Sequence, residues 1–536
     1  MKTMHYFIAV IAMQLLLNAC NTNSHSVSSQ GIVLQYMALE PTTDTTSGIH
    51  EQSKALETEG YDNIVENQFV TTLQQPLSTF SIDVDRASYS NVRRIIQNGS
   101  LPPAGAVRIE EMVNYFDYNY PQPVNDEPFS INTEISGCPW NTAHKLVHIG
   151  LHGKDIATDN LIASNLVFLV DVSGSMDEPS KLPLVQSSLK ILTDKLRDED
   201  NVAIVVYAGN AGLVLPSTKG SDKIKIKDAI EALSAGGSTA GGAGIQLAYK
   251  IAEENFKKNG NNRIILATDG DFNVGASSDD ELVRLIEEKR KSGIYLTVLG
   301  YGTGNYQDSK MQQLADKGNG NHAYIDNINE ARKVLVKEFG ATLFIIAKDV
   351  KLQVEFNPKK VQSYRLIGYE NRVLQNQDFN NDKKDAGELG SGHTVTALYE
   401  IIPVGVKDEF TTKVDDLKYQ DNKTATGNYT DELLTIKFRY KEPKSDVSKL
   451  IVHPVIDMNT SLELTSDNFK LSAAVAEFGL LLRNSSFKEN ATYKQTIELA
   501  KQSADDDKEG YRAEFIQLVK SAALLSENNK TVTVAE

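Results

Sequence analysis

The 536-residue sequence has two cysteines, one tryptophan and a shortage of positive charge. Two cysteines in a chain of this length exclude a disulfide-stapled scaffold and a cysteine-based zinc site. Lysine and arginine number 55 against 71 aspartates and glutamates, which gives a formal net charge of −16. This balance argues against a nucleic-acid-binding protein, which needs a basic surface, and against adhesion to anionic lipid through basic residues.

Long apolar runs are also scarce. The segment Tyr6–Leu17 is apolar over 12 residues, whereas a helix that spans a bilayer needs about 20. It follows Lys2 and ends in Leu17-Asn18-Ala19-Cys20, an order typical of a cleavable signal peptide. The last four residues resemble a bacterial lipobox, which implies that Cys20 is lipidated and becomes the new N-terminus. An ordinary signal peptide with a chance cysteine is the alternative.

We therefore expect residues 1–20 to be a lipoprotein signal peptide. The mature protein would then be a soluble body held in the bacterial cell envelope by lipid, at the outer membrane or at a periplasm-facing membrane. Residues 21–62 are rich in Ser, Thr, Gln, Asn and Glu and show no hydrophobic period. We expect a flexible tether, which as a coil of that length would reach roughly 35 Å.

Residues 161–345 alternate apolar strands with helical patterns. Strands are expected at 166–171, 202–208, 263–269 and 294–300, and helices at 182–196, 221–233, 242–256, 279–291 and 305–317. The strands are apolar almost throughout, which is typical of strands buried on both faces of a parallel sheet. The predicted fold class is α/β, with a doubly wound, mostly parallel, Rossmann-like sheet.

The flanking regions, 63–160 and 346–536, are richer in β-structure, and the second ends in a helical segment. Expected strands are 129–136, 145–151, 350–356, 362–367, 393–402 and 433–440, and expected helices are 467–482, 493–503 and 511–525. Neither flank alone has enough strands for a double-layered β unit. We therefore expect the two flanks to pack together, with the α/β domain inserted between them.

Polar side chains gather where three loops follow the predicted sheet. Asp171 ends the first strand and begins the motif D-x-S-x-S with Ser173 and Ser175. Thr239 lies in the glycine-rich loop 236–242, and Asp269 follows the strand 263–267. Ligands in open α/β sheets bind at the carboxyl ends of the strands. Hydroxyl and carboxylate oxygens are hard ligands that suit Mg²⁺ or Mn²⁺.

These five residues resemble, position by position, the metal-ion-dependent adhesion site of von Willebrand factor type A (VWA) domains. The resemblance implies that Ser173, Ser175 and Thr239 bind the metal directly or nearly so. It also implies that Asp171 and Asp269 act largely through water. Segments such as STFSIDVDRASYSNVRR and AVAEFGLLLR in the flanks look like those of bacterial VWA lipoproteins, whose flanks are uncharacterised in function.

The resemblance implies a membrane-anchored module, not an enzyme, that binds an acidic residue of a partner protein through Mg²⁺ or Mn²⁺. One alternative is a structural envelope protein whose metal only rigidifies the loops. Another is a metal-assisted hydrolase, which needs a general base. No histidine lies in the three loops, and the nearest in sequence are His152 and His322.

Three further histidines, His144, His148 and His152, share one face of a predicted strand. Each step of four residues spans about 13 Å along a strand, too far for the three to bind one zinc ion with bonds of about 2 Å. We expect them to form the exposed face of that strand.

Two weaker candidates remain. The acidic run 378–382, with Asp385 and Glu388, has the ligand types for Ca²⁺ but lacks the spacing of an EF-hand. We expect a solvated acidic loop there. Cys138 is expected to be a buried structural thiol, with an interaction or redox role as the alternative.

Overall fold

The computed structural model describes residues 59–124, 127–156, 162–238, 241–270, 279–338, 344–384, 386–410, 431–503 and 507–533. Cys20, the predicted signal peptide and nearly all of the predicted tether lie outside these ranges, so they stay predictions. Within the described ranges, no helix combines the length and the apolar character that crossing a membrane requires. The domain boundaries given above also stay predictions.

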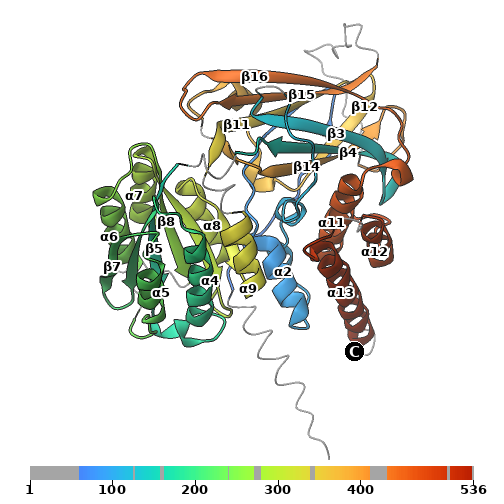
Figure 1. The fold of residues 1–536 in the computed structure, drawn as a ribbon. Helices are drawn as coiled ribbons and strands as arrows, with labels where there is room; N and C mark the ends of the chain where they lie inside the picture. Colours follow the sequence, from blue (N-terminus) through green and yellow to red (C-terminus); the bar gives the residue numbers. More distant parts are fainter. Residues whose placement is uncertain are drawn as a thin grey trace, which may run out of the picture. The chain divides into compact units, whose positions relative to one another are not determined.

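The central α/β domain contains a six-stranded sheet in the order β10-β9-β8-β5-β6-β7 (Figure 1). Its strands are β5 (Ser164–Asp171), β6 (Asn201–Tyr207), β7 (Ala211–Lys219), β8 (Asn261–Thr268), β9 (Ile294–Tyr301) and β10 (His322–Ile325). All neighbours are parallel except β7, which runs antiparallel to β6. The doubly wound, mostly parallel sheet is therefore confirmed, and β7 and β10 are additions to the predicted strands.

Helices cover both faces of this sheet. One face is packed by α6 (Gly241–Glu254), α7 (Asp279–Lys291) and α8 (Asp308–Lys317). The other is packed by α4 (Leu182–Lys195), α5 (Lys223–Glu231), α9 (Ile328–Arg332) and the turn η4 (Lys333–Lys337). The central strand β5 is buried at every position, which explains why its sequence is apolar without alternation.

The flanks form a β-sandwich to which both sides of the insertion contribute. One sheet has the order β1-β12-β14-β4-β3; the other has the order β13-β11-β15-β16, with β2 pairing β11. Strands before the insertion are β1 (Val70–Thr71), β2 (Leu77–Ser81), β3 (Phe129–Cys138) and β4 (Asn141–Gly153). Strands after it are β11 (Ile345–Phe356), β12 (Val361–Ile367), β13 (Gly387–Gly390), β14 (Thr394–Pro403), β15 (Glu432–Lys441) and β16 (Ser448–Ile456).

The pairing of β4 with β14 joins the two flanks directly, with Val147 opposite Tyr399 in the register. One hydrophobic core fills the space between the two sheets. The predicted packing of the flanks around an inserted domain is therefore confirmed.

A helical layer covers the outer face of the β4 sheet. It consists of α2 (Ala87–Gln97), α3 (Ile109–Val113), α11 (Asp467–Arg483), α12 (Tyr493–Lys501) and α13 (Tyr511–Thr533). Their core includes Trp140, Leu146 and Leu398 from the sheet side and Phe515 from α13. Cys138 is buried in the same core and has no disulfide partner, as expected for a structural thiol.

The expectation that His144, His148 and His152 form an exposed strand face is wrong. His144 and His148 are each 1% exposed and His152 is half-buried. Alternation along β4 places them on one face, but that face is covered by other parts of the flanks. His148, for example, contacts Tyr120 Oη at 2.7 Å and Ser472 Oγ at 2.9 Å, and burial lowers its pKa to about 3.

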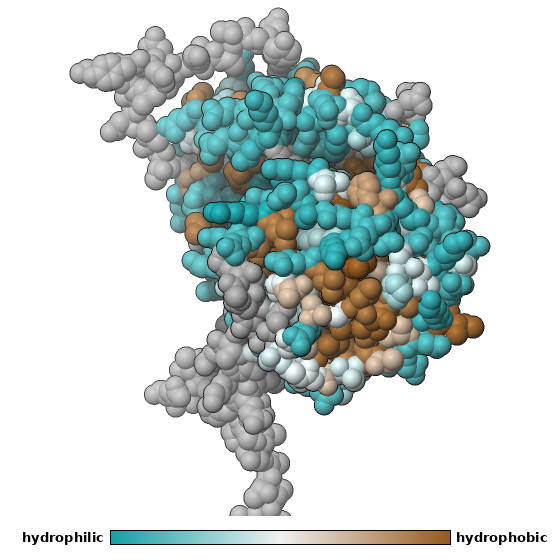
Figure 2. Space-filling view, turned by 90° about the vertical axis from the view of Figure 1, so that its left-hand side faces the viewer, coloured by the Kyte–Doolittle hydropathy of each residue, from teal (hydrophilic) through white to brown (hydrophobic). Residues whose placement is uncertain are grey.

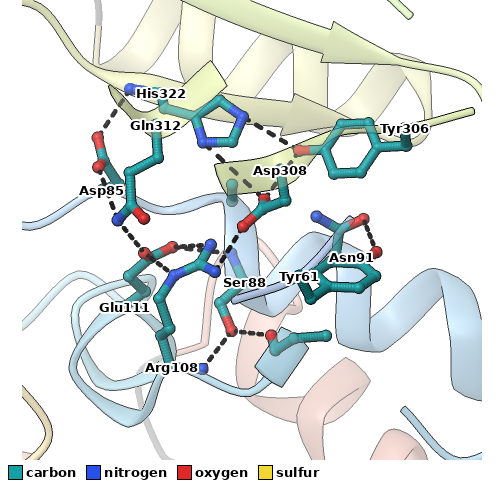
Figure 3. A network of polar contacts seen from close by, with 12 residues as sticks. Tyr61, Asp85, Ser88, Asn91, Arg108, Glu111, Tyr306, Asp308, Gln312 and His322 are labelled. Carbon is teal, nitrogen blue, oxygen red and sulfur yellow. Dashed lines mark hydrogen bonds and ion pairs between the residues drawn. The ribbon is translucent and has the colours of Figure 1, made fainter. Parts of the chain in front are cut away.

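Buried ion pairs and hydrogen bonds connect the α/β domain to the flanks. Arg108, which precedes α3, forms ion pairs with Glu111 on α3 and, at 2.5 Å, with Asp308 at the start of α8 (Figure 3). The backbone N–H of His322 on β10 donates to Asp85 at 2.7 Å in the same network. Polar groups of the flank therefore fix the position of the edge of the sheet that β10 forms.

Arg93 on α2 makes the most extensive of these contacts. Its guanidinium donates to Asp326 and Glu330 of the α/β domain at 2.5–2.8 Å and to Glu514 of α13 at 2.9 Å. It also donates to Tyr115 Oη at 3.0 Å. One buried cation thus joins the N-terminal flank, the inserted domain and the C-terminal helices.

We predict that Arg93→Met lowers the free energy of unfolding by about 3–5 kcal/mol, because it leaves buried carboxylates without their cation. Arg439→Met is the matched control, since Arg439 pairs with the half-exposed Asp382, and should cost less than about 1 kcal/mol. Urea unfolding followed by circular dichroism measures both. Equal losses in the two variants would contradict the role assigned to Arg93.

Candidate functional site

Four of the five predicted metal residues lie at the carboxyl ends of β5 and β8, where the strand order of the sheet reverses. Asp171 is the last residue of β5 and is fully buried. Its Oδ1 accepts the backbone N–H of Ser173 at 2.9 Å. Its Oδ2 accepts the hydroxyls of Tyr207 at 3.0 Å and Thr268 at 3.3 Å. Protein donors thus hold both carboxylate oxygens, which fits an Asp that acts on a metal through water.

Ser173 and Ser175 present their hydroxyls side by side in the loop after β5. Their Oγ atoms are 3.1 Å apart; Ser173 is buried and Ser175 is exposed. Two neighbouring ligands of an octahedral Mg²⁺ ion, with bonds of 2.0–2.1 Å, lie about 2.9 Å apart. The hydroxyl pair therefore fits two adjacent positions of such an ion, one facing the interior and one facing solvent.

The glycine-rich loop lies against the serine loop through its backbone. Gly236 N–H donates to the carbonyl of Val172 at 2.7 Å, and Gly174 N–H donates to the carbonyl of Gly237 at 3.1 Å. Gly237 has φ +87°, and a Cβ there would lie 3.3 Å from Gly209 N, so a side chain would be strained and crowded. Thr239 itself lies outside the described residues, and its part in the site stays a prediction.

Asp269 is fully buried beside the end of β8 and already has a cation. Lys181 Nζ donates to Asp269 Oδ2 at 3.1 Å, and Asn305 Nδ2 donates to the same oxygen at 3.1 Å. The stem of Lys181 crosses Gly302, where a Cβ would lie 2.5 Å from its carbons. Gly302, with φ +73°, has no side chain, and the Lys181 side chain occupies the space that a Cβ at this position would fill.

Burial of Asp171 and Asp269 close to each other makes it less favourable for both carboxylates to be charged. Burial raises the pKa of Asp171 to about 6; the hydrogen bonds from Ser173 act against this rise, and the charge of Asp269 adds to it. The neighbouring Tyr207 has its pKa raised well above its usual value, mainly by burial, so its hydroxyl stays protonated as a donor to Asp171.

The structure thus gathers Asp171, Ser173, Ser175 and Asp269 at one end of the sheet. It adds Tyr207, Thr268, Lys181 and Asn305, which the sequence analysis does not identify. Tyr207 ends the strand next to β5 and is paired with Asp171 in the register, so parallel strand order was a usable signal. Lys181 and Asn305 come from loops, and the sequence contains no comparable signal for them.

The other candidate sites are separate. The acidic run 378–382 is partly engaged, since Asp382 accepts from Arg439 and Ser448. Asp385 lies outside the described residues, and no metal-ligand group involving this run is found among the described ones. His322 contacts Tyr306 and faces Asp308 in the network with the flank (Figure 3).

We predict that Lys181→Met increases Mg²⁺ affinity by at least about tenfold, because like charges a few ångströms apart repel by more than about 1.4 kcal/mol at an effective dielectric of 20. The metal-free variant should melt at a lower temperature, since Asp269 loses its cation. Lys190→Met, which removes an exposed pair with Glu231, is the control. Calorimetric titration with Mg²⁺ measures the change, and an unchanged affinity contradicts it.

Comparison with known proteins agrees with this geometry. The family model described as "von Willebrand factor type A domain" matches residues 165–337. The model "von Willebrand factor" matches 55–148, and "Uncharacterized protein YfbK, C-terminal" matches 341–525.

Among individual proteins, the chain is 44% identical over 472 residues to "Uncharacterized protein YfbK" of Escherichia coli, covering 86% of this chain and 80% of that protein. It is 29% identical over 196 residues to "Uncharacterized protein sll0103" of Synechocystis, covering 37% of this chain and 45% of that protein. The solved structure "von Willebrand factor type A from Catenulispora acidiphila" is 18% identical, with a TM-score of 0.38, over 73% of this chain and 89% of that one. The chain therefore belongs to the family of the bacterial VWA-domain protein YfbK.

Proposed function

We propose that this protein is a lipid-anchored module that binds an acidic residue of a partner protein through Mg²⁺ or Mn²⁺ at Asp171, Ser173, Ser175, Thr239 and Asp269. VWA domains are generally protein-interaction modules, often with such a metal site. The described residues of the site have the ligand types and the hydroxyl spacing that a hard divalent ion requires.

The observation that carries the proposal is the ion pair between Lys181 and Asp269 at 3.1 Å. In formal charges, Asp171 and Asp269 contribute −2 and Lys181 contributes +1, so the site sums to −1 before a metal binds. A divalent ion changes this sum to +1. A carboxylate from a partner would then bring the sum to zero, so the site is electrostatically complete only when an acidic group joins it.

The ligand set acts in the same direction. Serine and threonine hydroxyls are neutral ligands, and they fill at most three of the six positions of an octahedral ion. The remaining positions are left to water, which a partner's carboxylate displaces. The protein as a whole carries −16, so the metal provides a local positive centre in a repulsive field, and salt should speed association with an acidic partner.

The edge strand β7 exposes two apolar side chains near the site. Leu213 and Val214 are 44% and 40% exposed, and the hairpin before β7 contacts the glycine-rich loop, since Gly209 N lies near Gly237. Figure 2 looks at the side on which Figure 1 places β7 and α6, and it shows apolar side chains gathered on the lower part of this face. Protein interfaces usually combine an apolar core with a polar rim, and these exposed apolar side chains could contribute to such a core.

The competing functions have less support. A hydrolase needs a free base beside the metal; the three loops contain no histidine, and Lys181 is engaged by Asp269. A metal that only rigidifies the loops has no need of a positive charge left over. Lys181, by offsetting one aspartate, would leave such a charge at the site once a divalent ion is bound.

We predict that Asp171→Ala, or removal of metal with EDTA, weakens partner binding at least about a hundredfold, because both changes remove the charge that attracts the carboxylate. The partner is first identified by crosslinking in the native cell. Asp194→Ala is the control; Asp194 is exposed near the other end of α4 and pairs with Lys227. Calorimetry measures the affinities.

Unfolding curves of the Asp171→Ala protein verify that the fold is intact. Partner binding that persists both in EDTA and in this variant would leave the metal with a structural role only.

The proposed anchor is tested separately. We predict that Cys20→Ala abolishes acylation, seen as the loss of acyl mass in the intact protein, and releases the protein from the membrane fraction. More than one acyl chain is needed for stable attachment, because a single chain binds only marginally. The anchor would be refuted if the variant stayed in the membrane fraction and differed in mass from the wild-type protein only by the Cys-to-Ala change. The proposal for the metal site would be unaffected.

A further inference from the structure

A second group of metal-ligating side chains lies where the β4 sheet meets the C-terminal helices. His144 is on β4, Glu400 is on β14, and Glu489 is in the loop between α11 and α12. Nδ1 of His144 lies 2.6 Å from Glu400 Oε1 and 3.9 Å from Glu489 Oε1. One ligand atom from each of the three residues lies within 4.8 Å of the others.

Each of these side chains is held from behind by a partner on its other polar atom. Nε2 of His144 lies 2.9 Å from Asp408 Oδ2. Oε2 of Glu400 accepts from Arg365 at 2.8 Å, and Oε2 of Glu489 accepts from Asn141 at 2.6 Å. A histidine whose outer nitrogen faces a carboxylate, with ligating carboxylates that are themselves hydrogen-bonded, is the usual surrounding of a bound metal.

The inward oxygen of Glu489 is the unexplained feature of this cluster. Its Oε1 atom is buried and has no hydrogen-bond partner, an arrangement that is costly for a carboxylate oxygen. The residue also has φ +39°, in the left-handed region that non-glycine residues rarely adopt. The backbone is therefore strained at the position that directs this oxygen toward His144 and Glu400.

We propose that His144, Glu400 and Glu489 form a binding site for a zinc-like divalent ion, distinct from the VWA metal site. An imidazole nitrogen with two carboxylate oxygens is a ligand set that suits Zn²⁺ and that Mg²⁺ and Ca²⁺ do not favour. Ligands of a tetrahedral zinc ion, with bonds of 2.0–2.2 Å, lie roughly 3.4 Å apart. His144 Nδ1 lies 3.9 Å from Glu489 Oε1 and is hydrogen-bonded to Glu400 Oε1 at 2.6 Å. A bound ion would replace that hydrogen bond, and shifts of less than about 1 Å would bring both oxygens to the ligand spacing of zinc.

The charges of the surrounding groups are consistent with one divalent ion. Glu400, Glu489 and Asp408 contribute −3, and Arg365 contributes +1. With His144 neutral, as a metal ligand must be, the group sums to −2, which a divalent ion cancels. Without the metal, a protonated His144 can bridge Glu400 and Asp408, but the sum is then −1 and Glu489 Oε1 keeps no partner.

The three ligands come from β4, β14 and the loop after α11, so a bound ion would join the sheet to the helical layer. Glu489 and Asp408 have side chains that are 16% and 10% exposed. They lie on the solvent side of the cluster, from which an ion and a fourth ligand, a water molecule, can enter.

The test uses full-length protein carrying Asp171→Asn, which disables the VWA metal site, after treatment with EDTA and dialysis. Titration with Zn²⁺ should show one ion per chain and a rise in melting temperature. Glu489→Gln should weaken Zn²⁺ binding at least about tenfold, and Asp408→Asn about 10–100-fold. Glu498→Gln, an exposed carboxylate on α12, should leave binding unchanged. Co²⁺ in place of Zn²⁺ should give visible absorption bands that Glu489→Gln alters.

Circular dichroism of each variant separates loss of binding from loss of fold. Zn²⁺ binding that is equal in the Glu489→Gln and Glu498→Gln proteins would overturn the proposal. The absence of stoichiometric binding in the Asp171→Asn protein would overturn it as well, and would leave a protonated His144 between Glu400 and Asp408 as the state of the cluster.

Discussion

The arrangement of this protein depends on one shared cation, the guanidinium of Arg93. Its donors contact Asp326 and Glu330 of the VWA domain and Glu514 of the C-terminal helices, while its own helix α2 belongs to the N-terminal flank. A buried charge is costly unless all of its partners are in place. The buried charges of the three parts of the chain are therefore all paired in this relative orientation. A rotation of the inserted domain would leave several of them unpaired.

The same contacts occupy one edge of the VWA sheet and leave the opposite edge outside the junction with the flanks. The edge strand β10 lies against α2, and its first residue, His322, is bound by Asp85 of the flank. The opposite edge strand, β7, contacts α5 and α6 of its own domain and exposes Leu213 and Val214. Asp171 and Asp269 lie between these edges, at the ends of β5 and β8. Attachment through β10 thus leaves the β7 edge outside the junction.

Much of this arrangement is visible in the sequence. Apolar strands fix the parallel sheet, and parallel strands bring Asp171 and Asp269 to one end. Contacts between distant loops are not visible: Lys181 reaches Asp269 only because Gly302 has no side chain to block it. The histidines of β4 show the same limit. Alternation predicts that His144 and His148 share a face, but it does not show that the helical layer covers that face. It also does not show that Glu400, 256 residues after His144, lies beside it on the neighbouring strand.

The two proposed metal sites differ in the formal charge of the residues around them, and this difference favours a different role for each. At the VWA site the proposed direct ligands are neutral hydroxyls, and Lys181 offsets one of the two aspartates. A divalent ion bound there would leave a surplus of one positive charge for the proposed carboxylate of a partner. At His144 the surrounding carboxylates and Arg365 already sum to −2, so the same ion is neutralised by the protein itself. A site with surplus charge at the end of a sheet is suited to binding a partner. A neutral site between a sheet and a helical layer is suited to holding the two together, because the ion has no charge left with which to attract a further ligand.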